Sequence, residues 1–340
     1  MALTAGARYA LGLRVANMLR RAAFVLGALA WAVPAFAQPY PSKPITLIVP
    51  FAAGGPTDLM ARIVGERMSK ELGQQIVIDN VTGAAGTIAL GKLAHAAPDG
   101  YTIGIGHLGT NVVNGLIYKN LNYDVLNDLE PIARLPANPL LVVTSNAVPA
   151  KDLKELVAYL KANGDKVSGG TAGTGSGTHI GFLAFQAATG TNYQLVPYRG
   201  TGPAVQDLIA NQIQIIIDQS SNSLPHVRAG KIRAYAVTAK ERSAAAPDIP
   251  TTAEAGFPGI EVTIWHGLWA PKGTPPEVIA KLNEAAVAAL KDPDIRRRLE
   301  DLGQDIPTPE EMQPKAFADF QRGEFAKWKP IIDKANVKVE

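Results

Sequence analysis

The sequence contains no cysteine among its 340 residues. Without cysteine the chain has no disulfide bond, no thiolate nucleophile and no metal site with sulfur ligands. Its histidines are few and scattered, at positions 95, 107, 179, 226 and 266, and none has the H-E-x-x-H spacing of a zinc site. We therefore expect no metal site, and the stability of the fold must come from its hydrophobic cores.

Long apolar runs are also absent. The run Ala22–Val33 ends at a proline and is shorter than the roughly 20 residues that a membrane-spanning helix needs. Two arginines precede it and Ala35-Phe36-Ala37 follows, which is the pattern of a cleavable signal peptide. We predict that residues 1–37 form this peptide, with cleavage after Ala37 and export of the remainder. Met18 offers an alternative start, which would leave residues 1–17 outside the protein.

The chain has no excess of positive or negative charge once residues 1–37 are removed. Residues 1–37 contain four arginines and no acid, so 29 basic and 30 acidic side chains remain. The mature chain therefore carries no basic surplus that would favour nucleic acid or an anionic membrane. The 303 residues that remain suggest about two domains of ~150 residues each.

Short apolar runs alternate with helix-period segments along the mature chain. Apolar runs such as Ile45–Val49, Tyr101–Ile105 and Ile213–Ile217 read as buried strands, and stripes such as Leu59, Met60, Ile63 and Val64 read as helix faces. This alternation predicts an α/β fold with parallel sheets and right-handed crossovers.

Two of the strand-to-helix turns are rich in glycine. Gly54-Gly55 follows the strand Ile45–Val49, and the segment Gly173–His179 follows a strand near Val167. Glycine lets the main chain approach a ligand closely, and the first N–H groups of a helix have no internal partner and carry a partial positive charge. Further helix starts follow Val196–Gly200 and Asp218, with Pro203 and Pro225 expected in the first turns. Two such sheets facing each other would enclose an anion such as a carboxylate.

Three segments resemble enzyme motifs but lack a required residue. Gly104–Gly109 matches the dinucleotide pattern G-x-G-x-x-G, but no βαβ unit with an acidic residue follows it. Gly86–Leu93 has phosphate-loop spacing with Leu93 in place of the magnesium-binding Ser or Thr. Gly173–Gly177 lacks the leading glycine of the nucleophile elbow. We expect no enzyme and no cofactor, although a secreted α/β enzyme acting on a small acid or ester stays an alternative.

Several segments together resemble a known family, the periplasmic solute receptors of tripartite tricarboxylate transporters, or Bug proteins. The matching segments are Tyr40–Ile45, Pro50–Asp58, Ala97–Thr102, Gly173–His179, Val196–Gly200, Pro250–Gly256 and Trp265–Pro271. They run along nearly the whole mature chain, and their order and spacing are more specific than any one of them.

The resemblance implies a type II periplasmic-binding-protein fold, with two three-layer α/β domains, a two-crossing hinge and a ligand cleft between the domains. We expect domain 1 at 38–140 and 263–340, domain 2 at 141–262, and crossings near Leu140–Val143 and Glu261–Trp265. It also implies a monomeric periplasmic receptor that captures a small organic carboxylate, mono- or dicarboxylate, aliphatic or aromatic, for membrane permease subunits. A receptor that feeds a sensor kinase instead is a second alternative.

The resemblance places one ligand carboxylate on the Pro50–Asp58 loop and the other polar end on Gly173–His179. Each candidate also has a structural interpretation: Phe51 as core, Asp58 or Thr57 as helix cap, Ser176 and Thr178 as caps, and Asp218 as a loop tether. His107 stands where the family pattern has a small residue, and Gln219–Asn222 is less apolar than that pattern, so both bear on ligand identity. The candidate ligand-binding residues are Phe51, Ala53, Gly54, Gly55, Thr57, Asp58, His107, Thr174, Gly175, Ser176, Thr178, His179, Tyr198 and Asp218.

Overall fold

The computed structural model describes residues 39–335 and 337–339. The predicted signal peptide, residues 1–37, lies outside them. The described residues from Pro41 onward form one compact unit. The predicted domain boundaries at 140/141 and 262/263 both fall inside this single unit and stay a prediction.

Nine strands of the described chain form one mixed sheet in the order β2-β1-β3-β9-β4-β7-β5-β6, with β8 also paired to β4. Strong β-branched and apolar composition makes these segments strands, as in Ile45–Val49 and Ile215–Gln219. The bounds are β1 Ile45–Val49, β2 Ile76–Asn80, β3 Thr102–His107, β4 Leu129–Ser145, β5 Ser168–Thr171, β6 Gln194–Pro197, β7 Ile215–Gln219, β8 Ile232–Val237 and β9 Thr263–Pro271.

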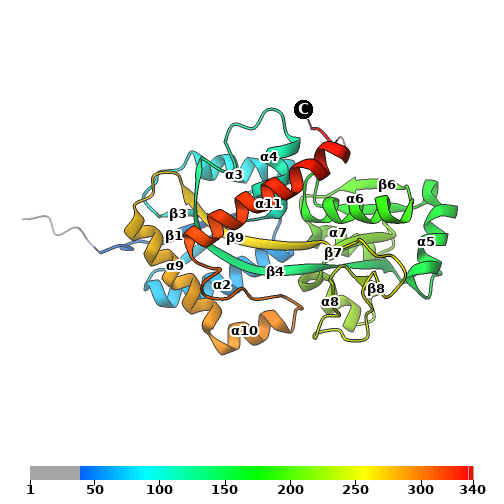
Figure 1. Cartoon of the computed structure of the whole chain (residues 1–340). Coiled ribbons are helices and arrows are strands. Elements are labelled where there is room, and N and C mark those ends of the chain that lie inside the picture. Colours follow the sequence, from blue (N-terminus) through cyan, green and yellow to red (C-terminus); the bar gives the residue numbers. More distant parts are fainter. Residues whose placement is uncertain (1–38, 336, 340) are drawn as a thin grey trace, which may run out of the picture. The chain divides into compact units, whose positions relative to one another are not determined.

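The sheet has two parts that share the long strand β4. In the first sheet part, β1 pairs in parallel with β2 and β3, and β9 runs antiparallel between β3 and β4. In the second sheet part, β5 pairs in parallel with β6 and β7, while β7 and β8 run antiparallel to β4. β4 pairs with β9 up to Pro139 and with β7 from Leu140 onward. Figure 1 shows β4 and β9 running side by side between the two groups of elements.

The 17-residue strand β4 was not predicted, and neither was the antiparallel character that it and β9 give the sheet. The sequence indicates only its apolar end, because Pro131, Pro136 and Pro139 interrupt the pattern and a proline cannot donate to a sheet. The structure accommodates two of them at irregularities, since the register with β9 shifts between Pro131 and Ala133 and again between Leu135 and Ala137.

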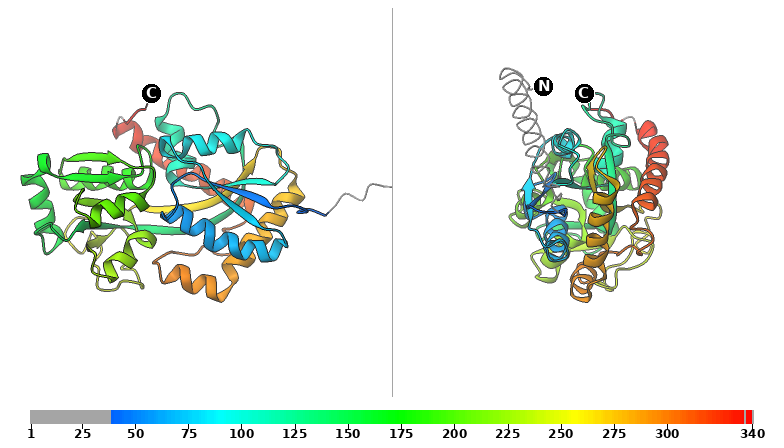
Figure 2. Two further views of the ribbon diagram at one scale, coloured as in Figure 1. Left: turned by 180° about the vertical axis from the view of Figure 1, so that it is seen from behind. Right: turned by 90° about the vertical axis from the view of Figure 1, so that its left-hand side faces the viewer.

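The helices follow the strands much as their apolar stripes predict, and Figure 2 shows them from two further sides. Pro203 lies in the first turn of α7, as expected, and Pro56 occupies the first position of α2. The expectation for Pro225 was wrong: α8 begins directly after β7, which puts this proline inside the helix. The bounds are α2 Pro56–Leu72, α3 Thr87–Ala94, α4 Asn114–Ile117, α5 Leu153–Ala162, α6 Gly177–Thr189, α7 Thr201–Ile209, α8 Ser220–Arg228, α9 Pro276–Lys291, α10 Pro293–Glu300 and α11 Pro314–Ala335, with a π-helical turn η2 at Gly109–Val113.

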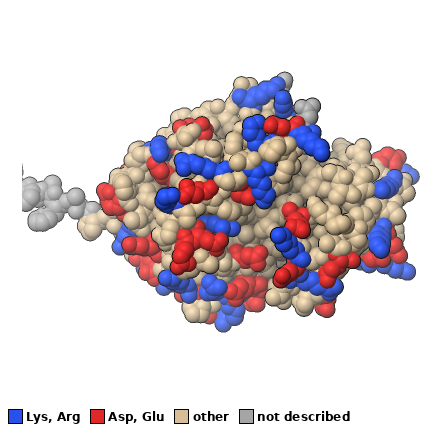
Figure 3. All heavy atoms as spheres, in the orientation of Figure 1, with Lys and Arg blue, Asp and Glu red and all other residues tan. Residues whose placement is uncertain are grey.

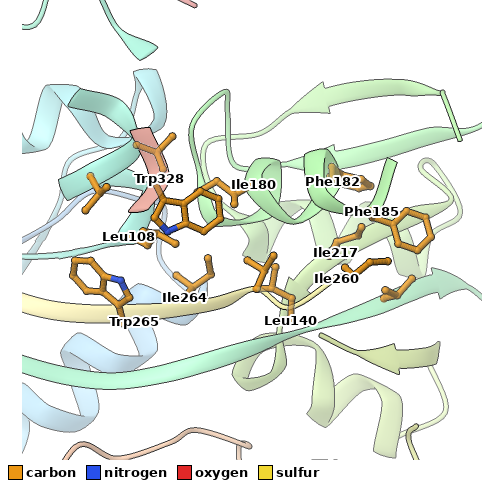
Figure 4. Packing of buried hydrophobic residues seen from close by; sticks show 14 of the residues in the cluster. Leu108, Leu140, Ile180, Phe182, Phe185, Ile217, Ile260, Ile264, Trp265 and Trp328 are labelled. Carbon is orange, nitrogen blue, oxygen red and sulfur yellow. The ribbon is translucent and has the colours of Figure 1, made fainter. Parts of the chain in front are cut away.

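A continuous apolar core fixes the positions of the helix starts that matter below. In Figure 4 it runs from Trp328 and Trp265 through Ile264 and Leu140 to Phe182. Gly177, the first residue of α6, packs on Ile264 of β9: a Cβ at this glycine would lie 3.1 Å from the isoleucine. The start of α6 is therefore held directly against the strands that link the two sheet parts.

The surface carries both signs of charge. Figure 3 shows Lys and Arg interspersed with Asp and Glu on the face that it presents. Within the described chain no helix is both long enough and apolar enough to cross a membrane.

Candidate functional site

The first wall of the site is the start of α2. The loop after β1 turns at Gly54, whose φ of 84° is a conformation that glycine adopts without strain, and Gly55 is the residue before the helix. Thr57 and Asp58 are at helical positions two and three, so their N–H groups have no carbonyl one turn earlier in α2 to bond. This turn therefore presents backbone donors at the positive end of the α2 dipole.

Asp58 braces that turn with both oxygens of its carboxylate. Oδ2 accepts from the Gly54 N–H and from Arg62 Nε, each at 2.9 Å, and Oδ1 accepts from Arg62 Nη2 and from Asn80 Nδ2. Asn80 Nδ2 also donates to the Phe51 carbonyl at 2.9 Å. Burial alone would raise the pKa of Asp58, but hydrogen bonds from Arg62, Gly54 and Asn80 outweigh it and hold the pKa below its usual range. The charge of Asp58 is thus compensated within the loop.

The second wall is the start of α6, which Ser176 caps. Ser176 Oγ accepts from the His179 N–H at 3.3 Å and lies 3.0 Å from Thr178 Oγ1, which in turn accepts from the Ala172 N–H at 3.0 Å. Both hydroxyls are buried, at 0% and 1% exposed. They tie the glycine-rich turn to the helix, as expected of capping residues.

Two further helices begin beside these walls. Thr201 is the first residue of α7, and Gln219 stands at the cap position of α8. Asp218, fully buried, lies behind them and accepts from Asn222 Nδ2 and Ser223 Oγ, both at 2.6 Å. Burial raises the pKa of Asp218 to about 6, although hydrogen bonds from Ser223, Asn222, the Gln219 backbone and Thr201 lower it. Asp218 thus fastens the α8 turn.

The four helix starts meet at one small cavity, here called the inner cavity. Its volume is about 10 Å³, roughly the room for one water molecule. No lining side chain is a lysine, arginine, aspartate or glutamate, so the cavity offers neutral polar groups and helix dipoles. The lining residues are Phe51, Gly55, Pro56, Thr57, His107, Ala172, Ser176, Gly177, Thr178, Thr201 and Gln219.

His107 is the only histidine among them and is held neutral. Burial lowers the pKa of His107 to about 3, and the neighbouring His266 acts in the same direction. Its Nδ1 accepts from the Gly109 N–H at 2.9 Å and from the Thr110 N–H at 3.3 Å. Its ring stacks on Phe51 with centroids 5.2 Å apart. Because Nδ1 is an acceptor, the proton of the neutral ring is on Nε2.

His266 lies behind His107 on the neighbouring strand β9. The two are cross-strand partners, and their rings meet edge to face with centroids 5.6 Å apart. Burial lowers the pKa of His266 to about 4, with the Pro136 backbone acting in the opposite direction. Its Nε2 is 3.3 Å from Thr57 Oγ1. The second histidine therefore positions a hydroxyl of the cavity wall.

A larger space, here called the outer chamber, lies on the other side of Phe51. Its volume is about 310 Å³, and Phe51 and Ala172 line both spaces. Tyr198 lies in its wall with its hydroxyl bonded to Asp207 Oδ2 at 2.7 Å, and Arg199 is the only basic residue among the lining residues. The residues that line the outer chamber are Phe51, Gly83, Ala84, Ala85, Gly86, Tyr118, Ala172, Gly173, Thr174, Pro197, Tyr198 and Arg199.

The structure places the sequence-predicted residues in three groups. Lining the inner cavity are Phe51, Gly55, Thr57, His107, Ser176 and Thr178, and Thr174 and Tyr198 line the outer chamber. The remaining candidates line neither space: Ala53 and Gly54 are exposed, Asp58 and Asp218 brace turns, and the Gly175 N–H donates to His179 Nδ1 at 3.3 Å.

Five residues that line the inner cavity were missing from the candidate list: Pro56, Ala172, Gly177, Thr201 and Gln219. Pro56 and Gly177 belong to the two glycine-rich turns that the sequence pointed to. A sequence signal also existed for Thr201, which opens a Pro-containing helix, and for Gln219, which follows the apolar run Ile213–Ile217. Ala172 gives no such signal, since nothing distinguishes it from a core alanine.

Comparison with known proteins identifies the family. Residues 60–337 match the family model described as "Tripartite tricarboxylate transporter family receptor". A protein of Agrobacterium vitis, described as "UPF0065 protein in the TAR-I ttuE-ttuC' intergenic region", is 41% identical over 288 residues, 83% of each chain. BugT of Bordetella pertussis is 34% identical over 310 residues, 91% of this chain and 94% of its own.

Solved structures agree with the sequence comparison. MatC of Rhodopseudomonas palustris, described with bound malate, is 41% identical with a TM-score of 0.83, over 86% of this chain and 100% of its own. The periplasmic binding protein BugD is 39% identical with a TM-score of 0.86, over 88% of this chain and 100% of its own. These relatives are solute-binding proteins and not enzymes, which confirms both the predicted fold class and the predicted absence of catalysis. The chain therefore belongs to the tripartite tricarboxylate transporter receptor family, the Bug proteins.

Proposed function

We propose that this receptor captures a small organic carboxylate and holds it with neutral donors at the starts of α2, α6, α7 and α8. The observation that carries the proposal is the inner cavity, where four helix N-termini converge and no side chain is charged. Each such terminus favours an anion through its free N–H groups and its dipole. A carboxylate buried there without an arginine is stable only if several donors meet it, and these turns supply them.

The chemical class of the ligand is supported by the relatives. MatC of R. palustris is described with malate, and Rpa4515 of the same species, 32% identical with a TM-score of 0.83, is described with adipate. Both ligands are dicarboxylates, one with a hydroxyl and one without. For the chain described here we propose a mono- or dicarboxylic acid whose head enters the inner cavity and whose body lies in the outer chamber against Phe51.

Binding requires the walls of the inner cavity to part, because about 10 Å³ cannot hold an acid head group. We propose that the two sheet parts separate through a change in β4 near Pro139 and Leu140, where its pairing passes from β9 to β7. The acid first meets one set of helix starts, and closure brings in the others. The ligand then favours the closed form only by the contacts that closure adds.

We place the receptor in the periplasm, after removal of residues 1–37, and propose that it delivers its ligand to membrane permease subunits. If the signal peptide is removed on export, the mature protein begins at Gln38, which N-terminal sequencing of the periplasmic fraction checks.

If the receptor delivers its ligand to a transporter, deletion of the receptor abolishes uptake of the acid. A role in feeding a sensor kinase would instead leave uptake unchanged and remove a transcriptional response.

The test of binding is a thermal-shift screen of the mature chain with aliphatic and aromatic mono- and dicarboxylic acids. We expect at least one acid to raise the melting temperature and its uncharged amide to leave it unchanged. A Kd near 1 μM corresponds to about −8 kcal/mol, which is within reach of a few charge-assisted hydrogen bonds and apolar burial. No response to any acid, or an equal response to acid and amide, would refute the proposal.

A further inference from the structure

His107 presents one hydrogen-bond donor to the inner cavity. Two backbone N–H groups, from Gly109 and Thr110, occupy its Nδ1 and so fix the proton on Nε2. The ring is 2% exposed and is clamped between Phe51 on its face and His266 at its edge. Its Nε2 makes no hydrogen bond to any described residue. The ring therefore offers an oriented, uncharged N–H.

Gln219 lines the same cavity and carries an unpaired acceptor. Its side chain is buried, at 3% exposed, and its Oε1 has no hydrogen-bond partner within the described part of the chain. A buried acceptor without a partner costs about 1–3 kcal/mol, so a group that can donate to it is favoured. Apart from Gln219 and His107, the walls of the cavity consist of apolar side chains, N–H groups at helix starts and Ser or Thr hydroxyls, which can donate as well as accept. The amide oxygen of Gln219 can only accept.

Few ligand groups satisfy both side chains. A carboxylate accepts hydrogen bonds but cannot donate to Gln219 Oε1. An ammonium group can donate, but it would meet the positive ends of four helix dipoles with no acidic side chain in the cavity wall. A hydroxyl both donates and accepts without carrying a charge.

From these contacts we infer that His107 and Gln219 together recognise a hydroxyl group on the ligand, so that the bound acid is a hydroxycarboxylate. His107 Nε2–H donates to the hydroxyl oxygen, and the hydroxyl hydrogen is donated to Gln219 Oε1. The helix starts hold the carboxylate as before. This inference rests on the proposed carboxylate receptor and narrows its ligand class.

The experiment compares acids that differ by one hydroxyl: malate with succinate, 2-hydroxyglutarate with glutarate, lactate with propionate, and mandelate with phenylacetate. Affinities are measured by titration calorimetry on the mature chain and on four variants. His107→Asn keeps an acceptor for the Gly109 and Thr110 N–H groups but lacks the Nε2 donor, whereas His107→Gln keeps a donor near Nε2. Gln219→Met removes the acceptor, and Tyr123→Phe is the control because it deletes another buried, unpaired oxygen that lies outside both spaces.

For at least one pair we expect the hydroxy acid to bind at least about tenfold more tightly than its partner. That ratio should fall to about threefold or less in His107→Asn and in Gln219→Met, stay higher in His107→Gln than in His107→Asn, and stay unchanged in Tyr123→Phe. Binding of acids without preference for the hydroxyl would overturn this inference and leave the receptor function standing. A preference for the hydroxy acid that persists in both His107→Asn and Gln219→Met would also overturn the inference. Failure of every acid to bind would overturn the receptor function itself. Gln219→Met alone decides the matter if the histidine variants do not fold.

Discussion

At the scale of single residues, Asp58 shows how an acidic side chain can stand at the start of an anion-binding helix. The sequence suggested that its charge would repel a carboxylate and that a capping role was the better interpretation. In the structure its carboxylate accepts four hydrogen bonds from Gly54, Arg62 and Asn80 and is 2% exposed. The residue shapes the loop, and we propose that the ligand meets the backbone of that loop.

Replacing Asp58 with Ala should lower the free energy of unfolding by about 2–4 kcal/mol. The change leaves the Gly54 N–H without its acceptor, removes one of the two acceptors of Asn80 Nδ2, and removes the buried partner of Arg62, which is itself half exposed. Urea unfolding measures the loss. The control is Asp294→Ala, whose ion pair with Arg297 is exposed, and it should change stability by about 0.5 kcal/mol or less. Equal effects of the two variants would contradict the bracing role.

The neutral histidines predict a pH dependence of stability. The pKa values of His107 and His266 are about 3 and 4 in the folded chain, below the ordinary 6.5, so between these values the unfolded chain binds more protons. The free energy of unfolding therefore has its full value with respect to these two histidines above pH 6.5. It decreases as the pH falls toward 4, by up to about 1.4 kcal/mol per pH unit for each histidine. The raised pKa of Asp218, about 6, acts in the opposite sense between 3.8 and 6 and partly offsets this loss.

We therefore expect the free energy of unfolding to fall between pH 6.5 and 4.5, and to fall less steeply in His107→Asn. Denaturant titrations at several pH values check both slopes. A slope that His107→Asn leaves unaltered would show that this ring is charged or exposed in the folded protein.

At the scale of elements, the glycine turn before α2 separates two roles that the sequence could not distinguish. The sequence predicts that both Gly54 and Gly55 contact the ligand. A Cβ at Gly54 would meet no atom within 4 Å, but its φ of 84° strains other residues. Gly55 has ordinary backbone angles, and its Cβ would lie 3.8 Å from Thr201 Oγ1 in the cavity wall. We infer that Gly54 is required for the conformation of the turn, and that Gly55 is required to leave room for the ligand in the inner cavity.

Gly54→Ala should cost about 1 kcal/mol of stability through backbone strain and leave acid binding largely unchanged. Gly55→Ala should leave stability nearly unchanged and weaken binding at least about tenfold, because its methyl group occupies the space of a ligand atom. Thermal melts and calorimetry on the two variants measure both quantities. The reverse pattern would mean that the ligand approaches Gly54 instead.

The elements that the sequence predicted well are those with local signals. Glycine turns, N-terminal prolines and helix stripes located the starts of α2, α6 and α7, because capping and turn chemistry act within a few residues. The length of β4 and the start of α8 were not predicted. The length of β4 is hard to predict because its prolines are untypical of a strand. The start of α8 depends on hydrogen bonds from Asn222 and Ser223 to Asp218, and the packing of β7 sets the position of Asp218.

At the scale of the whole described unit, β4 couples the walls of the site. Its first part pairs with β9, which carries His266, and its last residues pair with β7, which ends at Gln219. A change in β4 near Pro139 would therefore move the α2 side of the inner cavity relative to the α6–α8 side. Such long-range pairings bring Thr57, His107 and Gln219 together across more than 160 residues, and no local pattern announces them.

We expect ligand-dependent closure of the mature chain in solution. Small-angle X-ray scattering should show a smaller radius of gyration when a binding acid is added, because the cavity must open to admit the acid and close to hold it. The matched amide should produce no change. An identical radius with and without a bound acid would indicate that the acid enters without movement of the two sheet parts.

The central claim is that backbone N–H groups and neutral side chains, not a basic side chain, hold the acid. A crystal structure of the mature chain with its tightest-binding acid tests this most directly. We predict a carboxylate oxygen within about 3 Å of N–H groups at the starts of α2 and α6, directly or through one water, with no Lys or Arg within 4 Å. A carboxylate paired with Arg199 in the outer chamber, or an acid bound away from these helix starts, would contradict the account.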